Sequence, residues 1–154
     1  MLFRSELSAE SRDYLAGMAG RLKLSGPILD RIDLQIAVPH LTPEELLSFS
    51  GGAESSAAIR SRVVRAREVQ QRRWAPFGLS CNAELPEKLV RRHLELSAES
   101  RDYLAGMAGR LKLSGRGISR VLKVARTIAD LAGEPSIRTP HLAEALMYRQ
   151  GNAP

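Results

Sequence analysis

Arginine is the residue type in this chain that is numerous and closely spaced enough to bind a charged ligand. Segment 55–73 contains six arginines and a single glutamate, Glu68. The six are Arg60, Arg62, Arg65, Arg67, Arg72 and Arg73. Guanidinium groups neutralise phosphate charge, and binding of this kind weakens as salt is added. Trp74 and Phe77 follow closely enough to suggest that aromatic rings stack on bases. The segment is therefore a candidate nucleic-acid surface.

The same segment has a structural interpretation that the sequence leaves equally open. A solvated helix could pack through Ile59 and Val63 and hold its arginines in water. In that interpretation Trp74 belongs to the core, which we favour for this residue. The net charge of +6 and the isoelectric point of about 10.1 fit an anionic partner and a generally basic surface alike.

Metal and thiol chemistry find little support in the sequence. His40, His93 and His141 have no spacing typical of metal ligands, and we expect them to be surface or capping residues. Cys81 is the single cysteine, which excludes an intrachain disulfide and a cysteine-based zinc cluster. It has no nearby base, so we expect no nucleophile, and the lack of disulfides indicates a reducing compartment.

Apolar periodicity predicts a mainly α chain that positions these arginines on helices. Helices are expected over about 8–23, 55–73, 98–112 and 117–132. Two more are expected where a proline can occupy the first helical position, at Pro86 and at Pro140, with Thr139 as the N-cap of the latter. Residues 32–38 alternate apolar and polar side chains, which predicts one short strand.

No apolar run approaches the roughly 18 residues of a membrane span. The first residues also lack the apolar stretch of a signal peptide. We therefore expect a cytoplasmic protein with no membrane partner.

An internal duplication divides the chain. Residues 6–26 recur letter for letter at 95–115, a shift of 89 residues. Natural repeats share a pattern and drift in sequence, so identity of this kind indicates a recent or engineered copy. It also predicts that one copy lies in its native context and the other does not.

Several stretches, taken in order, resemble the C-terminal part of the magnesium-chelatase-like AAA+ ATPases, closest to the competence-related ComM/YifB type. They are SGPILDRIDLQIAVP, GAESSAAIRSRVVRAREVQ and LSGRGISRVLKVARTIADLAG, followed by HLAEALMYR, at 25–39, 52–70, 113–133 and 141–149. The resemblance covers roughly residues 24–150, and several motifs agree in order.

The resemblance implies a helical-bundle lid domain with one short strand from the end of an ATPase core. In these terms residues 1–24 are a duplicated, misplaced helix, 25–50 a remnant of the core and 51–150 the lid. The second copy of the repeat is the native one, because it runs into GRGISRVLKVARTIADL as in the family. Intact relatives look like hexameric motors that use ATP and Mg²⁺, and the ComM type is linked to DNA branch migration.

Arg31, in LDRIDL, resembles the arginine finger of this family, which reaches the γ-phosphate bound by a neighbouring subunit. Such a finger is worth roughly 10³–10⁵ in rate. From the tripeptide alone, a surface ion pair of Arg31 with Asp30 or Asp33 is the simpler interpretation.

Arg116 resembles the sensor-2 arginine of the lid, and Arg120 is the second choice for that role. Arg116 is expected at the N-terminus of the helix over 117–132, where backbone N–H groups also favour phosphate. The alternative is a solvated basic face that includes Lys123.

The ATPase motifs themselves are missing from the sequence. No G-x-x-x-x-G-K-[ST] loop occurs in the 154 residues, and no strand ends in an acidic pair. The chain alone is therefore expected to bind no cofactor and to hydrolyse no ATP. Two alternatives stay open: a non-catalytic DNA-binding module that uses 55–73, and an oligomer, such as a swapped dimer, that forms through the duplicated helix.

Overall fold

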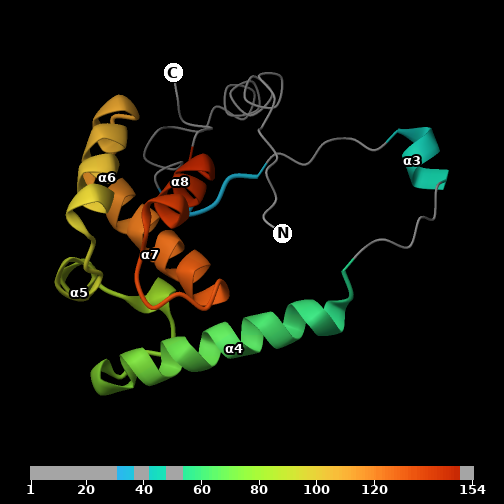
Figure 1. The fold of residues 1–154 in the computed structure, drawn as a ribbon, viewed down its shortest axis with the longest axis horizontal. Helices are drawn as coiled ribbons and strands as arrows, with labels where there is room; N and C mark the ends of the chain where they lie inside the picture. Colours follow the sequence, from blue (N-terminus) through green and yellow to red (C-terminus); the bar gives the residue numbers. More distant parts are fainter. Residues whose placement is uncertain (1–30, 37–41, 48–53, 150–154) are drawn as a thin grey trace. The chain divides into compact units, whose positions relative to one another are not determined.

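The structure, a computed structural model, describes residues 31–36, 42–47 and 54–149 (Figure 1). His40 and the predicted helix over 8–23, which belongs to the first copy of the repeat, lie outside the described residues. The chain divides into two compact units, Met1–Ala53 with Tyr148–Pro154, and Glu54–Met147.

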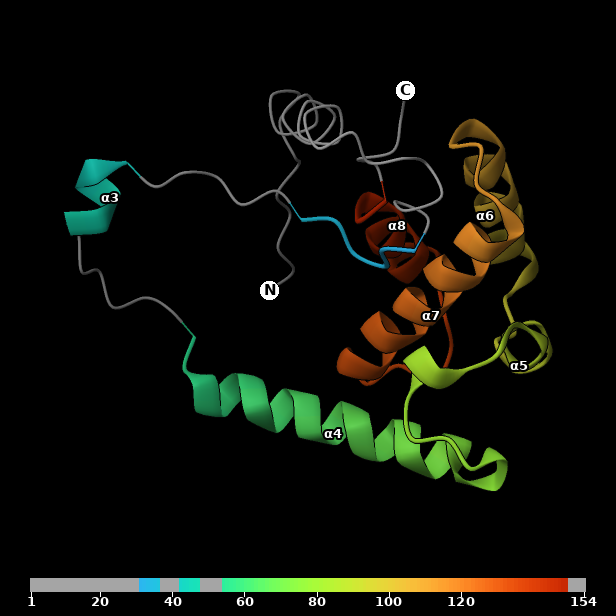
Figure 2. The ribbon, with the colours of Figure 1, turned by 180° about the vertical axis from the view of Figure 1, so that it is seen from behind.

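The second unit is a helical bundle built around one central helix. Its helices are α4 (Ser56–Trp74), α5 (Glu87–His93), α6 (Ala98–Arg110), α7 (Gly115–Leu131) and α8 (Thr139–Met147). Two short 3₁₀ helices, η1 (Ala75–Phe77) and η2 (Asn82–Glu84), join α4 to α5. Helix α7 packs against α8, α4, α5 and η2, and α6 packs against α8 (Figures 1 and 2). The prediction of a mainly α, lid-like bundle is confirmed.

The central helix shows why this sequence is helical here. Apolar side chains at i, i+3 and i+4 spacing bury one face, as at Val121, Leu122 and Ala125. The hydroxyl of Ser114 accepts a hydrogen bond from the Gly117 N–H at 3.0 Å, so α7 begins before the predicted 117. Gly133 adopts a positive φ of 73° just after the helix, as a C-terminal glycine is expected to do.

The core lies between α7 and the helices around it. Trp74 is 1% exposed, which confirms its assignment to the core. The cluster also contains leucine, valine, isoleucine and alanine side chains from the other helices and loops: Leu85, Val90, Leu94, Leu104, Val121, Leu122, Ala125, Ile137, Leu142, Ala145 and Leu146.

The remaining boundaries differ from the sequence predictions by a few residues. Pro86 precedes α5 and is its N-cap instead of its first helical residue. Helix α8 already includes Thr139. A side chain within the helix stabilises its start, because Nδ1 of His141 accepts the Arg138 N–H at 3.1 Å. This contact gives His141 the capping role that the sequence left open for it.

The structural interpretation of α4, in which it packs through Ile59 and Val63, is wrong for these two residues. Ile59 and Val63 are 42% and 44% exposed, because the N-terminal half of α4 projects beyond α5–α8 (Figures 1 and 2). Ile59 lies two turns and Val63 one turn before the buried Ala66, and both continue that face of the helix into solvent.

The strand predicted over 32–38 is not formed in its described part, residues 32–36. The first unit instead has a turn and a bend, followed by the short helix α3 (Pro43–Leu47). The Gln35 N–H donates to the Tyr148 carbonyl at 3.0 Å, and the Arg149 guanidinium donates to the Ile32 carbonyl at 3.1 Å. Alternation predicts a strand only where a partner strand supplies a ladder, and none is present among the described residues.

None of the described helices combines the length and the apolar composition needed to cross a bilayer.

Candidate functional site

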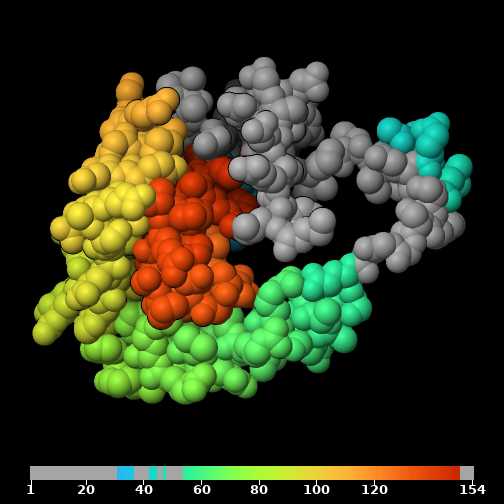
Figure 3. Space-filling view, in the orientation of Figure 1, coloured from blue at the N-terminus to red at the C-terminus, as the bar shows by residue number. Residues whose placement is uncertain are grey.

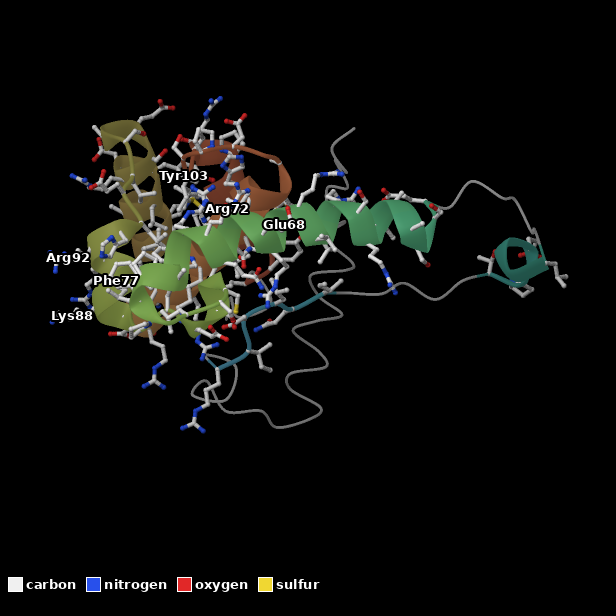
Figure 4. All side chains as sticks on the ribbon, turned by 90° about the horizontal axis from the view of Figure 1, so that it is seen from below. Glu68, Arg72, Phe77, Lys88, Arg92 and Tyr103 are labelled. Atoms are coloured by element: carbon white, nitrogen blue, oxygen red, sulfur yellow. The ribbon has the colours of Figure 1, made fainter. Side chains whose placement is uncertain are left out.

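The arginines of α4 do not form one continuous stripe. At 100° per residue, Arg60 and Arg67 share one side of the helix, whereas Arg65 and Arg72 share another. All four are exposed. Arg65 donates to the Ser61 hydroxyl at 2.7 Å. Arg72 donates to the Glu68 carbonyl at 3.3 Å, and Figure 4 shows these two residues on α4. These contacts leave the guanidinium groups in solvent.

Arg62 is tied to an acidic neighbour at the start of the same helix. Its guanidinium donates to both carboxylate oxygens of Glu54, at 2.8 and 3.1 Å. This hydrogen bond, together with the carboxylate charge, raises the pKa of Arg62. An exposed pair of this kind contributes little to stability, so Arg62 could exchange Glu54 for another anion.

Arg73 differs from the other α4 arginines because it belongs to a buried polar network. Its guanidinium donates to Asp130 on α7 at 3.0 and 2.7 Å, in a two-pronged ion pair. The Asp130 side chain is 0% exposed and that of Arg73 is 26% exposed. Arg73 therefore joins α4 to α7, and this role competes with any role on a nucleic acid.

A second arginine, Arg126, is itself buried and also pairs with Asp130. Arg126, one turn earlier on α7, donates to the Asp130 carboxylate at 3.1 Å and to the carbonyls of Pro135 and Glu134 at 2.9 and 2.6 Å. Burial lowers the pKa of Arg126, and the Asp130 charge opposes that shift. One carboxylate thus faces two guanidinium groups.

Asn82, from η2, links this network to the tryptophan. The Trp74 indole N–H donates to the Asn82 amide oxygen at 2.8 Å, and the Asn82 amide nitrogen donates to Asp130 at 2.9 Å. The side-chain oxygen of Gln70 accepts the Asn82 backbone N–H at 3.3 Å. Every polar atom named here is buried and has a partner, which is the condition for a stable buried network.

A basic and aromatic surface lies where α4 ends and α5 begins. Phe77 is 41% exposed, and its ring packs edge-on against His93 with 4.8 Å between ring centroids. Figure 4 shows Phe77, Lys88 and Arg92 at this end of the bundle. The exposed side of α5 carries a shallow, open hollow lined by Glu87, Lys88, Arg91 and Arg92. We call Phe77, Lys88, Arg91 and Arg92 the α5 surface.

The α7 residues assigned to nucleotide have different surroundings. Arg116 is exposed in the first turn of α7 and makes no ion pair or side-chain hydrogen bond within the described part of the chain. Arg120, one turn later, is half-buried. Lys123 donates to the Ala83 carbonyl at 3.0 Å, so it holds η2 against α7.

Arg31 is exposed in the segment 31–36 of the first unit. Within the described residues, no three side chains of His, Cys, Asp or Glu come together as metal ligands would. The described residues therefore offer guanidinium groups, and no carboxylate cluster, for binding a phosphate-bearing ligand.

Sequence reasoning missed the Asp130 network and the α5 surface. The signal for the first was a charged pair at i, i+4, Arg126 and Asp130, on the apolar side of a strongly periodic helix, where charge is costly unless it is paired. The α5 surface had a signal in KLVRRH, where basic residues flank the half-buried Leu89 and the buried Val90. The position of Phe77 against this helix depends on the turn through η1 and η2.

Comparison with known proteins identifies the family of this chain and several of its relatives. The family described as "Magnesium chelatase, subunit ChlI C-terminal" matches residues 53–149. "Competence protein ComM" of Haemophilus influenzae is 44% identical over 127 residues, which cover 82% of this chain and 24% of that protein. The uncharacterized protein YifB of Escherichia coli is 41% identical over 127 residues, which again cover 82% of this chain and 24% of that protein.

An uncharacterized protein of Mycobacterium bovis is 39% identical over 146 residues, which cover 95% of this chain and 27% of that protein. So long a match necessarily includes part of residues 6–26. The chain spans about a quarter of the length of these relatives. With the match over 53–149 containing the whole of the second unit, the chain belongs to the magnesium chelatase ChlI C-terminal family.

Proposed function

We propose that this chain is the lid portion of a magnesium-chelatase-like AAA+ ATPase and that Arg116 contacts nucleotide phosphate there. The observation that carries the proposal is the contrast among the arginines of the second unit. Arg73 and Arg126 are held by Asp130, whereas Arg116 is exposed, without an ion pair in the described residues, at the N-terminus of the central helix. A guanidinium and helix N–H groups at one place suit an anion.

In this proposal the chain has no ATPase activity of its own. It lacks a phosphate-binding loop, so ATP and Mg²⁺ would be held by a core on another part of the protein or on another subunit. Arg31 would act in trans, on the nucleotide of a neighbouring subunit in a hexameric ring. The intact protein would process DNA in the cytoplasm.

A chimera tests the role of Arg116. Residues 27–149 replace the corresponding C-terminal quarter of Haemophilus influenzae ComM, and a fluorescent ATP analogue is titrated into the purified protein. A hydrogen bond to a charged group is worth about 1.5–3 kcal/mol, so Arg116→Ala should weaken binding roughly 10- to 100-fold. Arg110→Ala, an exposed arginine at the end of α6, is the matched control and should bind as the parent does.

The same chimera separates Arg31 from Arg116. A finger that acts in trans stabilises transition-state charge, so Arg31→Ala should lower hydrolysis and leave binding of the analogue unchanged. Loss of binding in Arg31→Ala, or unchanged binding in Arg116→Ala, would contradict the assigned roles.

We propose a second function, nucleic-acid binding, for the α5 surface together with the exposed arginines of α4. The specific observation in its favour is an exposed aromatic ring, Phe77, that packs against His93 of α5, the helix that carries Lys88, Arg91 and Arg92. Base stacking on an aromatic ring and phosphate neutralisation by basic side chains are the two parts of single-strand binding.

Fluorescence anisotropy with a short single-stranded DNA, at 50 and 200 mM salt, tests the second function. Binding that weakens steeply with salt is expected. Phe77→Ala should weaken binding at both salt concentrations, because it removes stacking without changing charge. Arg101→Ala, which changes an exposed arginine of α6, is the control and should have little effect. Equal effects of the two substitutions would reject the α5 surface as the binding site.

A further inference from the structure

The residues through which α6 packs into the bundle all lie inside the repeated sequence. Helix α6 buries Ser100, Leu104 and Ala108. Tyr103 and Met107, with the apolar side chains of its flanking turns, pack partly buried against the core. In the space-filling view α6 lies along the flank of the α7–α8 pair (Figure 3). We call this receiving surface the α6 groove.

Polar contacts of the same segment also use repeated residues. The Ser100 hydroxyl lies 3.4 Å from that of Thr139 on α8, and Ser97 caps α6 by accepting the Ser100 N–H at 3.2 Å. Leu96 forms an isolated parallel bridge with Ile137. The residues that α6 and its preceding turn contribute to these contacts, Leu96, Ser97 and Ser100, lie within 95–115, and residues 6–26 have the same sequence.

We infer that residues 6–26 are a second occupant of the α6 groove, interchangeable with residues 95–115 of the same chain. The free energy of docking depends on side chains that both copies carry. Leu15, Ser11 and Ala19 stand where Leu104, Ser100 and Ala108 stand in the second copy. One groove therefore has two candidate helices of identical sequence.

The connections decide which copy occupies the groove. Helix α6 is held by short turns at both ends, so it is the ordinary occupant. The turn into α7 places Lys112 at a φ of 48°, in the left-handed region that a lysine seldom adopts. The first copy is joined to the second unit through residues 27–53. With α3 kept helical, and once the hydrogen bonds of Ile32 and Gln35 to residues 148 and 149 open, this segment can reach about 80 Å at most. A domain of this size is about 30 Å across, so the first copy can reach the groove in its own chain at a millimolar effective concentration.

Matched aspartate substitutions in the two copies test the exchange in the full chain. Leu104→Asp places a charge at a site that is 6% exposed and should displace α6. Because the first copy then takes its place, the variant should keep a cooperative thermal transition with only a modest fall in midpoint. Leu15→Asp alone should leave the midpoint unchanged, and the double variant should lose the transition.

A disulfide gives a direct readout of which copy is docked. In a chain carrying Cys81→Ser, Ser11→Cys and Thr139→Cys, oxidation should produce an intramolecular bridge when Leu104→Asp is also present. The same chain without Leu104→Asp should bridge far less, because Ser100 faces Thr139 there. The bridge should form equally well at high and low protein concentration.

Three results would overturn the inference. The first is loss of the transition in Leu104→Asp alone, to the same extent as in the double variant. The second is a double variant that melts like the parent, since the groove would then need no occupant. The third is a bridge that forms only between two molecules.

Discussion

Removing the Asp130 carboxylate should be among the most damaging single changes to the second unit. Asp130 accepts hydrogen bonds from Arg73, Arg126 and Asn82, and its side chain is fully buried. In Asp130→Ala the Arg126 guanidinium, 5% exposed, keeps its carbonyl partners but loses its counter-charge. Breaking a buried ion pair from one side costs about 3–5 kcal/mol. The free energy of unfolding of a domain of this size is about 5–15 kcal/mol, so the substitution should remove a large part of it.

Urea unfolding followed by tryptophan fluorescence measures this loss conveniently. Trp74 is the one tryptophan in the chain, and its indole N–H donates to Asn82 inside the network. The control is Arg62→Ala, which removes an exposed ion pair with Glu54 and should leave the urea midpoint nearly unchanged.

A double variant distinguishes an unpaired charge from lost packing. Arg126→Met with Asp130→Leu removes both buried partners and should recover part of the stability lost in Asp130→Ala. A loss below about 1 kcal/mol in Asp130→Ala, close to the average for point substitutions, would refute the account of the network.

Three further perturbations follow from the local geometry. Burial lowers the pKa of His141, so the folded chain binds a proton less readily there than the unfolded chain does. The urea midpoint should therefore be highest above about pH 6.5 and should fall as the pH drops below that value. His141→Gln should reduce this dependence on pH. Gly133→Ala should destabilise the second unit by the cost of a left-handed residue, about 1 kcal/mol, seen as a lower melting temperature. A Cβ there meets nothing within 4 Å, so only the φ of 73° is unfavourable. Ser114→Ala should cost about 1 kcal/mol through loss of the α7 cap, as measured by the same melting curves.

The helices of the second unit could be predicted because local signals agreed there. The period of α7, its cap and the glycine after it all indicate the same helix, and the structure differs by only two residues at its start. The strand predicted over 32–38 is not formed in its described part, 32–36. Alternation of apolar and polar side chains shows that the two faces of a segment differ in polarity, but it does not show whether a partner strand exists.

The candidate site could be predicted only in part. Six arginines on one helix are visible in the sequence, yet their partners are not, since Asp130 lies 57 residues from Arg73 along the chain. Exposure of Ile59 and Val63 was equally hidden, because the sequence does not show where the bundle beneath α4 ends. Burial and pairing of a side chain depend on tertiary contacts, and residue type alone decides neither.

The membership of the chain in the magnesium chelatase ChlI C-terminal family makes its role in hydrolysis the central question. The most direct measurement is the steady-state rate of ATP hydrolysis of the ComM chimera with Arg116→Ala, compared with that of Arg110→Ala. If Arg116 contacts the phosphates, Arg116→Ala should hydrolyse ATP at least about tenfold more slowly, the equivalent of about 1.4 kcal/mol, while Arg110→Ala keeps the rate of the parent. Equal rates for the two variants in a folded, active chimera would contradict the account.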